Sequence, residues 1–581
     1  MAFLRNLLAT VVGLFVFFFL LMALVAGIAS TASQDEVPDV KENSVLWLKL
    51  SGALQERAPE ESFNDFFPGA TPRVIGLDVL LRAIESAKED DRISGIYMEH
   101  MYLSASYAML SEIRQALAEF RKSGKFIYAY GEFISESDFF LASVADKLYL
   151  NPLGNLEFNG LAANVTFYKG LFDKLEIEPE IFRVGSYKSA IEPFIRKDLS
   201  TENREQLKEL VLSINNTYLE EVANSLSVEK DQLREIQNKM LGQTPDELAD
   251  LKLVTATAYE DQIKEEIMWE VDEEEVGDIN FISFRNYEKA VEKEYSKNKI
   301  AIIVGEGEIV MGGEPSENII GEKFAREIRK ARESKSVKAI ILRINSPGGS
   351  ITASDMIWRE VQKTKGVKPI LASMSGVAAS GGYYMAMACD TIVASPATIT
   401  GSIGIFSMLF NLQDFLDNKL GITSDGVSSG DYSDIFTVMR PLNEQEKAII
   451  QKGVNRGYET FINKAAQGRN MSKEEMEALA QGRVWTGEQA KANGLVDVMG
   501  GLKETVELAA AAADIEDDFR VSYYPRQKPF FETIIERFGE EARSVVWSSP
   551  AYQQLKTLED IQKFTKMSGL QARMLMDLEI N

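Results

Sequence analysis

Along most of this chain, segments with the apolar spacing of a helix alternate with segments typical of a buried strand. This alternation predicts an α/β fold. Stretches with apolar residues three and four positions apart read as amphipathic helices, and each is followed by a short run rich in β-branched residues. Residues 76–98, for example, read as a helix, a polar turn and a buried strand. Such an order is typical of parallel strands joined by right-handed crossovers, so we expect a mostly parallel sheet covered by helices.

The pattern of helix, turn and strand occurs twice, about 244 residues apart. Four stretches of the first half align in order with stretches of the second half: 76–98 with 321–343, 125–152 with 368–396, 182–194 with 426–438, and 242–254 with 486–498. We therefore expect two tandem α/β units, at 45–284 and 300–513, joined by a charged linker at 285–299. The tail at 514–581 reads as short amphipathic helices.

Residues 1–34 are expected to anchor the chain in a membrane. The stretch 7–28 is almost continuously apolar, and about 20 such residues cross a bilayer as a helix. Arg5 precedes this stretch, and Asp35 and Glu36 follow it. The positive-inside rule then places the N-terminus in the cytoplasm and the rest of the chain across the membrane. A cleaved signal peptide is the alternative, because small residues follow the apolar stretch.

Composition narrows the chemistry that the two units can perform. The 581 residues include 88 acidic and 63 basic ones, a net charge of −25, which opposes a broad nucleic-acid surface. The one cysteine, Cys389, excludes an intramolecular disulfide and is expected to be a buried thiol. The one histidine, His100, follows an apolar strand and is not expected to be catalytic. A hydrolase of this composition needs another base, because a Ser-His-Asp triad would have to use that histidine.

The two copies of the repeat differ at a few positions, and these positions are the candidates for catalytic residues. The second copy has a glycine pair after a strand, in INSPGGS (344–350), and a serine, Ser380, before two glycines that open a helix. Free backbone N–H groups at both places suit an oxyanion hole, although a tight turn and a helix cap are the commoner explanations. The first copy lacks both features and places Glu136 near the serine position. It has instead Lys188, which faces Ser433 in the alignment and would ordinarily lie on the surface.

Together these motifs resemble the long-form bacterial signal peptide peptidase A family, Ser-Lys serine proteases of the Clp-protease/crotonase-like superfamily. The resemblance covers nearly the whole chain and rests on four segments, in order: VGSYKSAIEPF, RINSPGGSITAS, MSGVAASGGYYMA and SPATITGSIGIF. It implies tandem duplicated Clp-protease/crotonase-like units, with Ser380 as nucleophile and Lys188 as general base. It also implies that Ser402 orients the lysine and that Gly349 and Gly381 form the oxyanion hole.

A lysine can act as a base only when its amine is unprotonated, and the sequence around Lys188 allows this. An ordinary lysine is protonated at neutral pH, and burial away from water is what lowers its pKa enough to free the amine. Lys188 has apolar neighbours, so we expect it to enter a cleft between the two units and to be neutral there. The expected reaction needs no metal and no organic cofactor.

The resemblance also implies peptide substrates, chiefly signal peptides already released by signal peptidase, and a homotetramer. It implies a single-pass protein of the bacterial cytoplasmic (inner) membrane, with its catalytic body on the periplasmic side. Two alternatives remain: a crotonase-like enzyme acting on acyl-CoA thioesters, and a non-catalytic membrane scaffold in which the repeats only oligomerise. Binding of coenzyme A would support the first, and failure to react with serine-directed probes would support the second.

Overall fold

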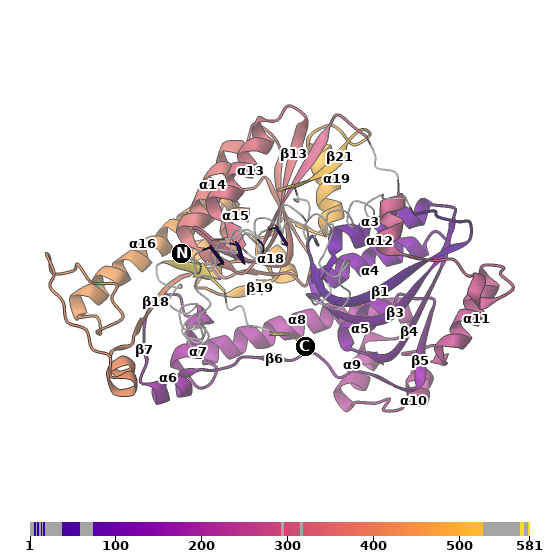
Figure 1. Cartoon of the computed structure of the whole chain (residues 1–581), viewed down its shortest axis with the longest axis horizontal. Helices are drawn as coiled ribbons and strands as arrows, with labels where there is room; N and C mark the ends of the chain where they lie inside the picture. The colour runs from indigo at the N-terminus through magenta and orange to yellow at the C-terminus, as the bar shows by residue number, and fades with distance from the viewer. Residues whose placement is uncertain are drawn as a thin grey trace.

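A mostly parallel sheet covered by helices lies in each half of the chain (Figure 1). The computed structural model describes residues 38–58, 74–291, 295–313, 318–526, 570–574 and 579–580, with a few positions before residue 18. Within these residues the two sheets lie side by side, each with its own apolar core. The α/β class expected from the apolar pattern is therefore confirmed.

The first sheet has its strands in the order β2-β1-β3-β4-β5-β8, with β9 also paired to β1, and these pairs are parallel. Its strands are β1 (Ser44–Gln55), β2 (Val74–Gly76), β3 (Ile93–Ser104), β4 (Phe126–Ile134), β5 (Lys147–Leu156), β8 (Ala256–Thr257) and β9 (Phe281–Ser283). The helices of this half include α3 (Leu77–Glu89), α4 (Tyr107–Arg121), α5 (Glu136–Ala142), α8 (Thr201–Leu226), α9 (Lys230–Lys239), α10 (Pro245–Asp250), α11 (Glu260–Glu270) and α12 (Phe284–Ala290). Val45 and Leu46 are adjacent in β1 and fully buried in different apolar clusters, because helices cover both faces of the sheet.

The second sheet has the order β19-β17-β15-β13-β10-β21, with β16 beside β15 and β20 beside β16. Its strands are β10 (Lys299–Glu306), β13 (Val337–Ser346), β15 (Ile370–Ala379), β16 (Thr391–Ala394), β17 (Ile399–Gly401), β19 (Val484–Thr486), β20 (Val498–Met499) and β21 (Arg520–Tyr524). Its helices include α13 (Gly321–Glu333), α14 (Ile351–Thr364), α15 (Gly381–Ala386), α16 (Glu444–Arg469), α17 (Lys473–Leu479), α18 (Gly487–Ala492) and α19 (Leu502–Ala512). The pair α13 and β13 repeats α3 and β3, as the alignment predicts, and both helices have 13 residues.

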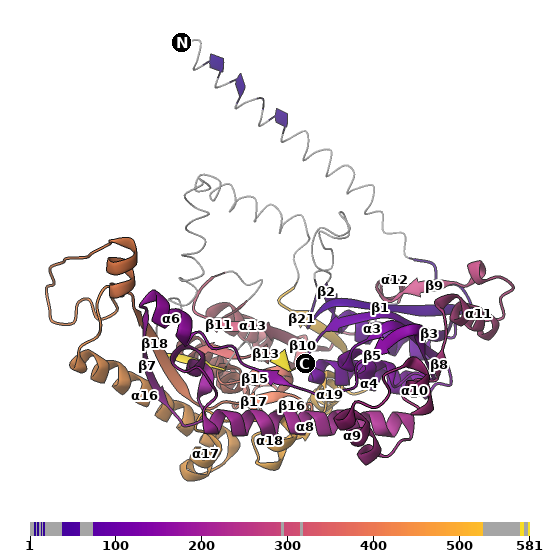
Figure 2. The same cartoon turned by 90° about the horizontal axis from the view of Figure 1, so that it is seen from below.

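A third sheet joins parts of the chain that are far apart in sequence. Its order is β12-β11-β14-β22-β18-β7. Its strands are β7 (Glu178–Val184), β11 (Glu308–Val310), β12 (Asn318–Ile320), β14 (Gly348–Ser350), β18 (Ile405–Asn411) and β22 (Gln571–Arg573). Strand β7 comes from the first half of the chain and pairs antiparallel with β18 of the second half along its whole length. Figure 2 shows β7 beside β18, at the end of the molecule away from the first sheet.

Aromatic side chains explain why a piece of the first half crosses to the second. The helices α6 (Lys169–Leu175) and α7 (Glu192–Ile195) flank β7 and bury Phe172 and Phe194 against Phe410 of β18. The long helix α8 then leads back toward the first sheet (Figure 1). The expected first unit therefore contains a segment whose packing partners belong to the second.

The segments outside the two units differ in part from what the sequence predicts. The tail was expected to be helical, but its described residues include three strands: β21, β22 and β23 (Glu579–Ile580). The alternating side chains of RVSYY in β21 suit an edge beside β10, and β23 pairs with β6 (Ala163–Asn164). The predicted helix ETIIERFGEEARSVV lies outside the described residues. The expected linker begins with α12, which is capped by Ser283 and packs on α3.

The membrane anchor predicted at 1–34 lies outside the described residues, apart from a few helical positions. Within the part of the chain that the structure describes, no helix is both long enough and apolar enough to span a bilayer.

Candidate active site

Ser380 lies where β15 ends and α15 begins. Its backbone has φ 55° and ψ −110°, a strained conformation for a residue with a side chain. The side chain makes no capping hydrogen bond to the helix, so capping does not explain why a serine stands at this position. Its Oγ instead lies 2.9 Å from the Nζ of Lys188, and the residue is fully buried.

Lys188 reaches Ser380 from the first half of the chain, because the pairing of β7 with β18 carries the turn after β7 to the second sheet. Its side chain is 1% exposed. Besides the contact with Ser380, the Nζ lies 3.1 Å from both the carbonyl oxygen and the Oγ of Ser402. All three partners are neutral, and burial lowers the pKa of Lys188 well below 10.5. The sequence predicts that Lys188 lies between the two units, and its contacts with Ser380 and Ser402 of the second half agree with that position.

Ser402 contacts the amine of Lys188 through both its carbonyl oxygen and its hydroxyl oxygen. Its backbone N–H donates to the carbonyl of Arg483 at 2.7 Å, and its φ of 52° is unusual for a serine. The hydroxyl donates to the carbonyl of Gly482 at 3.4 Å and therefore accepts from the amine. A neutral amine has two N–H groups and one lone pair. With both N–H groups directed to Ser402, the lone pair faces the hydroxyl of Ser380.

Two glycines that sequence reasoning did not single out pack against the stem of Lys188. A Cβ on Gly482, which has φ 78°, would lie 2.7 Å from the lysine Cβ, and a Cβ on Gly404 would lie 3.2 Å from the lysine Cδ. The preceding residue, Tyr187, is held by a hydrogen bond from its N–H to the carbonyl of Gln481 at 3.0 Å. Gly404 stands inside the motif SPATITGSIGIF, which offered a signal, whereas no motif marks Gly482.

The glycines expected to form an oxyanion hole lie close together beside Ser380. Gly381 is the first residue of α15, where a helix leaves backbone N–H groups without intrahelical partners. Gly348 has φ 102°, and a Cβ on it would lie 2.6 Å from the backbone nitrogen of Gly381. A Cβ on Gly349 would collide with the carbonyl oxygen of Ile309. Only glycine fits this close approach of three backbone segments.

A buried ion network connects the two halves of the chain. Arg343 of β13 is 1% exposed, and its guanidinium lies 2.7 Å from a carboxylate oxygen of Glu56 and 2.6 Å from one of Glu112. It also donates to the hydroxyls of Ser373 and Ser375. Because the two acids belong to the first half, the network holds the halves in register. Sequence analysis missed it, since isolated charged residues ordinarily face solvent.

The other residues considered from the sequence stay apart from this site. Cys389 is 1% exposed, as expected, and burial raises the pKa of its thiol. Ser433, which aligns with the lysine in the second copy, is exposed. The side chain of His100 lies outside the described ones.

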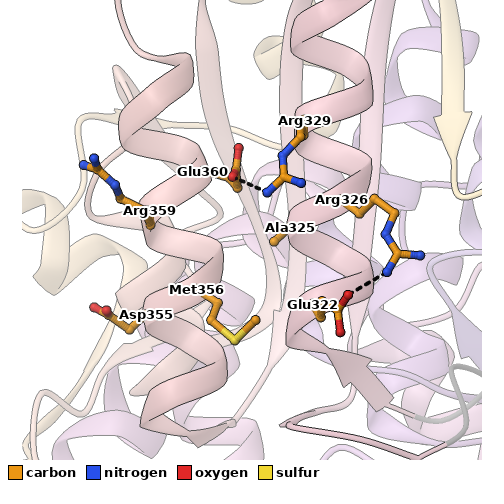
Figure 3. Close-up of a pocket in the computed structure, with 8 residues that line it drawn as sticks. All are labelled: Glu322, Ala325, Arg326, Arg329, Asp355, Met356, Arg359 and Glu360. Carbon is orange, nitrogen blue, oxygen red and sulfur yellow. Dashed lines mark hydrogen bonds and ion pairs between the residues drawn. The ribbon is translucent and has the colours of Figure 1, made fainter.

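A surface hollow between α13 and α14 offers no comparable chemistry (Figure 3). Four of its six charged side chains pair with one another on the helix faces: Arg329 with Glu360 at 2.6 Å, and Arg326 with Glu322 at 2.7 Å. Ion pairs of this kind on partly exposed helices contribute little energy and leave few free groups for a ligand.

Known proteins resemble the chain over most of its length. Residues 119–273 and 362–516 each match Peptidase family S49, one stretch in each half, and residues 292–398 match Clp protease. The chain is 32% identical to protease 4 of Haemophilus influenzae, over 98% of this chain and 96% of that protein. It is 35% identical to protease 4 of Salmonella typhi, over 86% and 79% of the two chains. It is 33% identical to the chloroplastic serine protease SPPA of Arabidopsis thaliana, over 92% and 78%.

The fold and these similarities define a serine protease built from duplicated Clp-like α/β units. The chain belongs to peptidase family S49. The family and the enzyme class predicted from the motifs are thus confirmed. The acyl-CoA enzyme and the non-catalytic scaffold, which the sequence left open, are set aside by the same matches.

Proposed function

We propose that this protein is a membrane-anchored endopeptidase in which Ser380 is the nucleophile and Lys188 is the general base. The observation that carries the proposal is the 2.9 Å contact between the serine Oγ and a buried lysine amine whose partners are all neutral. A lysine accepts a proton at neutral pH only when its amine is unprotonated, and burial provides that condition. The two groups come from different halves of the chain, so the proposed active site needs both.

In the proposed reaction, Lys188 accepts the hydroxyl proton while the Oγ of Ser380 attacks the carbonyl carbon of a peptide bond. The N–H groups of Gly349 and Gly381 stabilise the negative charge on the carbonyl oxygen. The lysine then gives its proton to the leaving nitrogen, and the carbon–nitrogen bond breaks to leave an acyl-enzyme. A water molecule, deprotonated by the same lysine, hydrolyses the ester. Ser402 orients the amine during both steps.

The substrates that we propose are extended peptides, chiefly signal peptides left after cleavage. Strand β22 lies between β14 and β18 in the third sheet, and a peptide that takes its place beside β14 would gain main-chain hydrogen bonds without regard to its sequence.

We also propose that residues 1–34 hold the protein in the bacterial cytoplasmic membrane, with the catalytic body on the periplasmic side. This proposal rests on the apolar stretch 7–28 and on the charges that flank it. Protease added to intact spheroplasts should digest the body. Protection of the body until the membrane is permeabilised would place it in the cytoplasm instead.

The proposed homotetramer has a candidate contact surface in the segment between β18 and α16. This segment projects from the body (Figures 1 and 2) and exposes Val427, Tyr432 and Phe436. It contains the stretch 426–438, whose counterpart 182–194 in the first copy packs on the second half of the same chain. By analogy we propose that 426–438 packs on the first half of a neighbouring chain, a head-to-tail contact that can close into a ring. Phe436→Asp should lower the mass measured by light scattering, while Val367→Asp, at an exposed site elsewhere, should not.

The assay that tests the catalytic roles is cleavage of a quenched apolar peptide by the full-length protein in detergent, from pH 6 to pH 10. Ser380→Ala and Lys188→Ala should each lose roughly a thousandfold or more in kcat/KM. The parent's rate should rise with an apparent pKa well below 10.5. Lys208→Ala, at an exposed site on α8, is the matched control and should behave like the parent. If Lys188→Ala keeps most of the activity, the base lies elsewhere.

A further inference from the structure

The segment 481–484 of the second half lies between the proposed base and the serine that contacts its amine. On one side, the N–H of Tyr187, the residue before the base, donates to the carbonyl of Gln481 at 3.0 Å. On the other side, the N–H of Ser402 donates to the carbonyl of Arg483 at 2.7 Å. The position of the base relative to its partners therefore depends on how firmly the turn of the base is held against this segment.

A buried glutamine of α8, Gln206, contacts the turn of the base and this segment at once. Its side chain is 3% exposed. The side-chain nitrogen lies 3.3 Å from the carbonyl oxygen of Tyr187 and 3.0 Å from the hydroxyl of Ser189, the residues on either side of the base. The side-chain oxygen accepts from the N–H of Val484 at 3.3 Å. One planar amide thus joins both flanks of the base to the segment that holds Ser402.

A buried carboxylate, that of Glu192, fixes the direction of this amide. Glu192 belongs to the motif VGSYKSAIEPF and is 1% exposed. It accepts hydrogen bonds from the N–H of Ser200 at 3.2 Å and from the side-chain nitrogen of Asn203 at 2.9 Å. The side-chain oxygen of Asn203 then lies 3.0 Å from the side-chain nitrogen of Gln206. Because a carboxylate only accepts, it turns the nitrogen of Asn203 toward itself, and this in turn directs the nitrogen of Gln206 toward the turn of the base.

We propose that Gln206 is a positioning residue for the proposed base. It holds the amine of Lys188 within reach of the hydroxyl of Ser380, and the inference rests on the proposed function because it takes this lysine as the base. Glu192 and Asn203 keep the amide of Gln206 in the orientation that this requires. The lysine and serine atoms are 2.9 Å apart, and a misplacement of about 1 Å at such a distance costs about a hundredfold in rate.

Gln206→Met tests the proposal, because methionine fills a similar volume and forms none of these hydrogen bonds. The kcat for the quenched apolar peptide should fall roughly ten- to a hundredfold, while KM stays within about twofold. The rate of labelling by a fluorophosphonate, a serine-directed probe, should fall by a similar factor. The apparent pKa of that labelling rate should rise toward 10.5, because a loosened turn lets water reach the amine of Lys188.

Gln237→Met is the matched control for the loss of a buried amide. Gln237 is also 3% exposed, and its side chain donates to a buried glutamate, Glu136, in the first copy. The control should lose stability in urea as Gln206→Met does, yet keep the kcat and the pH profile of the parent. If Gln206→Met also keeps the parent's kcat and pH profile, the inference is overturned and the proposed function stands.

A second background shows whether the glutamine acts through the lysine. The labelling rates of Lys188→Ala and of Lys188→Ala combined with Gln206→Met should be equal, since no amine remains to be positioned. A further loss as large as in the parent background would mean that Gln206 acts independently of the base, and it would overturn the inference. Labelling of Lys188→Ala at the parent's rate refutes the proposed function instead.

A milder variant keeps the test decisive if Gln206→Met does not fold. Glu192→Gln preserves the shape of the side chain and removes only the carboxylate that orients the two amides. It should lower kcat and raise the apparent pKa of labelling in the same way, by a smaller factor. A profile identical to that of the parent would overturn the inference.

Discussion

Replacing Lys188 by methionine is expected to stop catalysis and yet to stabilise the protein at neutral pH. The lysine is 1% exposed, and burial lowers its pKa. The proposed mechanism requires a neutral amine in the folded chain, whereas the unfolded chain carries an ammonium group at neutral pH, so folding must release a proton at a cost in free energy. Methionine is unbranched, apolar and adaptable in shape, and it removes that cost.

Proton linkage gives the magnitude and the sign. Between the lowered pKa of folded Lys188 and the unfolded value of 10.5, the unfolded state holds one proton more than the folded state. The parent therefore gains about 1.4 kcal/mol of stability per pH unit as the pH rises through that window. Methionine also loses the two hydrogen bonds to Ser402, about 1 kcal/mol each. We expect the variant to be the more stable protein near neutral pH and the parent to be the more stable once the pH exceeds 10.5.

Urea denaturation at several values between pH 7 and pH 10 measures this difference. Both proteins carry Ser380→Ala, so that proteolysis does not occur during the experiment. Lys208→Met, at an exposed position of α8, is the control and should show a difference from its parent that does not change with pH. A difference between Lys188→Met and its parent that is likewise constant would mean that the lysine has the same charge in both states. That result would refute the neutral base.

Three further predictions address the surroundings of the site. Gly482→Ala should lower kcat about a hundredfold with an unchanged circular dichroism spectrum, because its Cβ would displace the lysine stem. Arg343→Met should destabilise the protein in urea by about 3–5 kcal/mol, because it leaves Glu56 and Glu112 buried without their cation. Burial, together with Glu56, raises the pKa of Glu306 to about 7, so the folded state binds the extra proton between pH 4.5 and 7. The parent should therefore lose stability as the pH rises through that window, and Glu306→Gln should lack this loss when melting temperatures at pH 5 and pH 8 are compared.

The α/β fold could be predicted because the chain contains its own comparison, which also marked Lys188 and Ser380, whereas the pairing of these two residues was implied by the family resemblance. The two copies share a pattern of helices and strands, and a residue that only one copy has is easily noticed. Lys188 in the first copy and Ser380 in the second stand out in this way. The periods that indicate helices and strands depend only on residues near one another in the sequence. They could therefore be read in both copies, and α13 and β13 fold as α3 and β3 do.

Features that depend on distant partners could not be read in this way. Strand β7 has the composition of an ordinary strand, and no local pattern indicates that it pairs with β18 rather than with the first sheet. The ion pairs of Arg343 and the close approach of Gly482 to the lysine stem arise from packing between segments far apart in sequence. The strand at 571–573 could not be predicted either, because three residues are too few to show the alternation of apolar and polar positions that marks a strand. Its partner β14 is also short.

The structure of the first copy explains why one chain holds one proposed site rather than two. Glu136 stands where the second copy has its serine, and its carboxylate accepts hydrogen bonds from the backbone N–H groups of Asn159 and Gly160 and from the side chain of Gln237. With these partners, the carboxylate of Glu136 connects a loop to the start of helix α5. It does not supply a hydroxyl nucleophile. In the second copy Ser433 stands in the aligned lysine position and is exposed, so a base there would stay protonated. The duplication thus left the proposed base in one copy and the proposed nucleophile in the other, and only the crossing of β7 to β18 brings the two together.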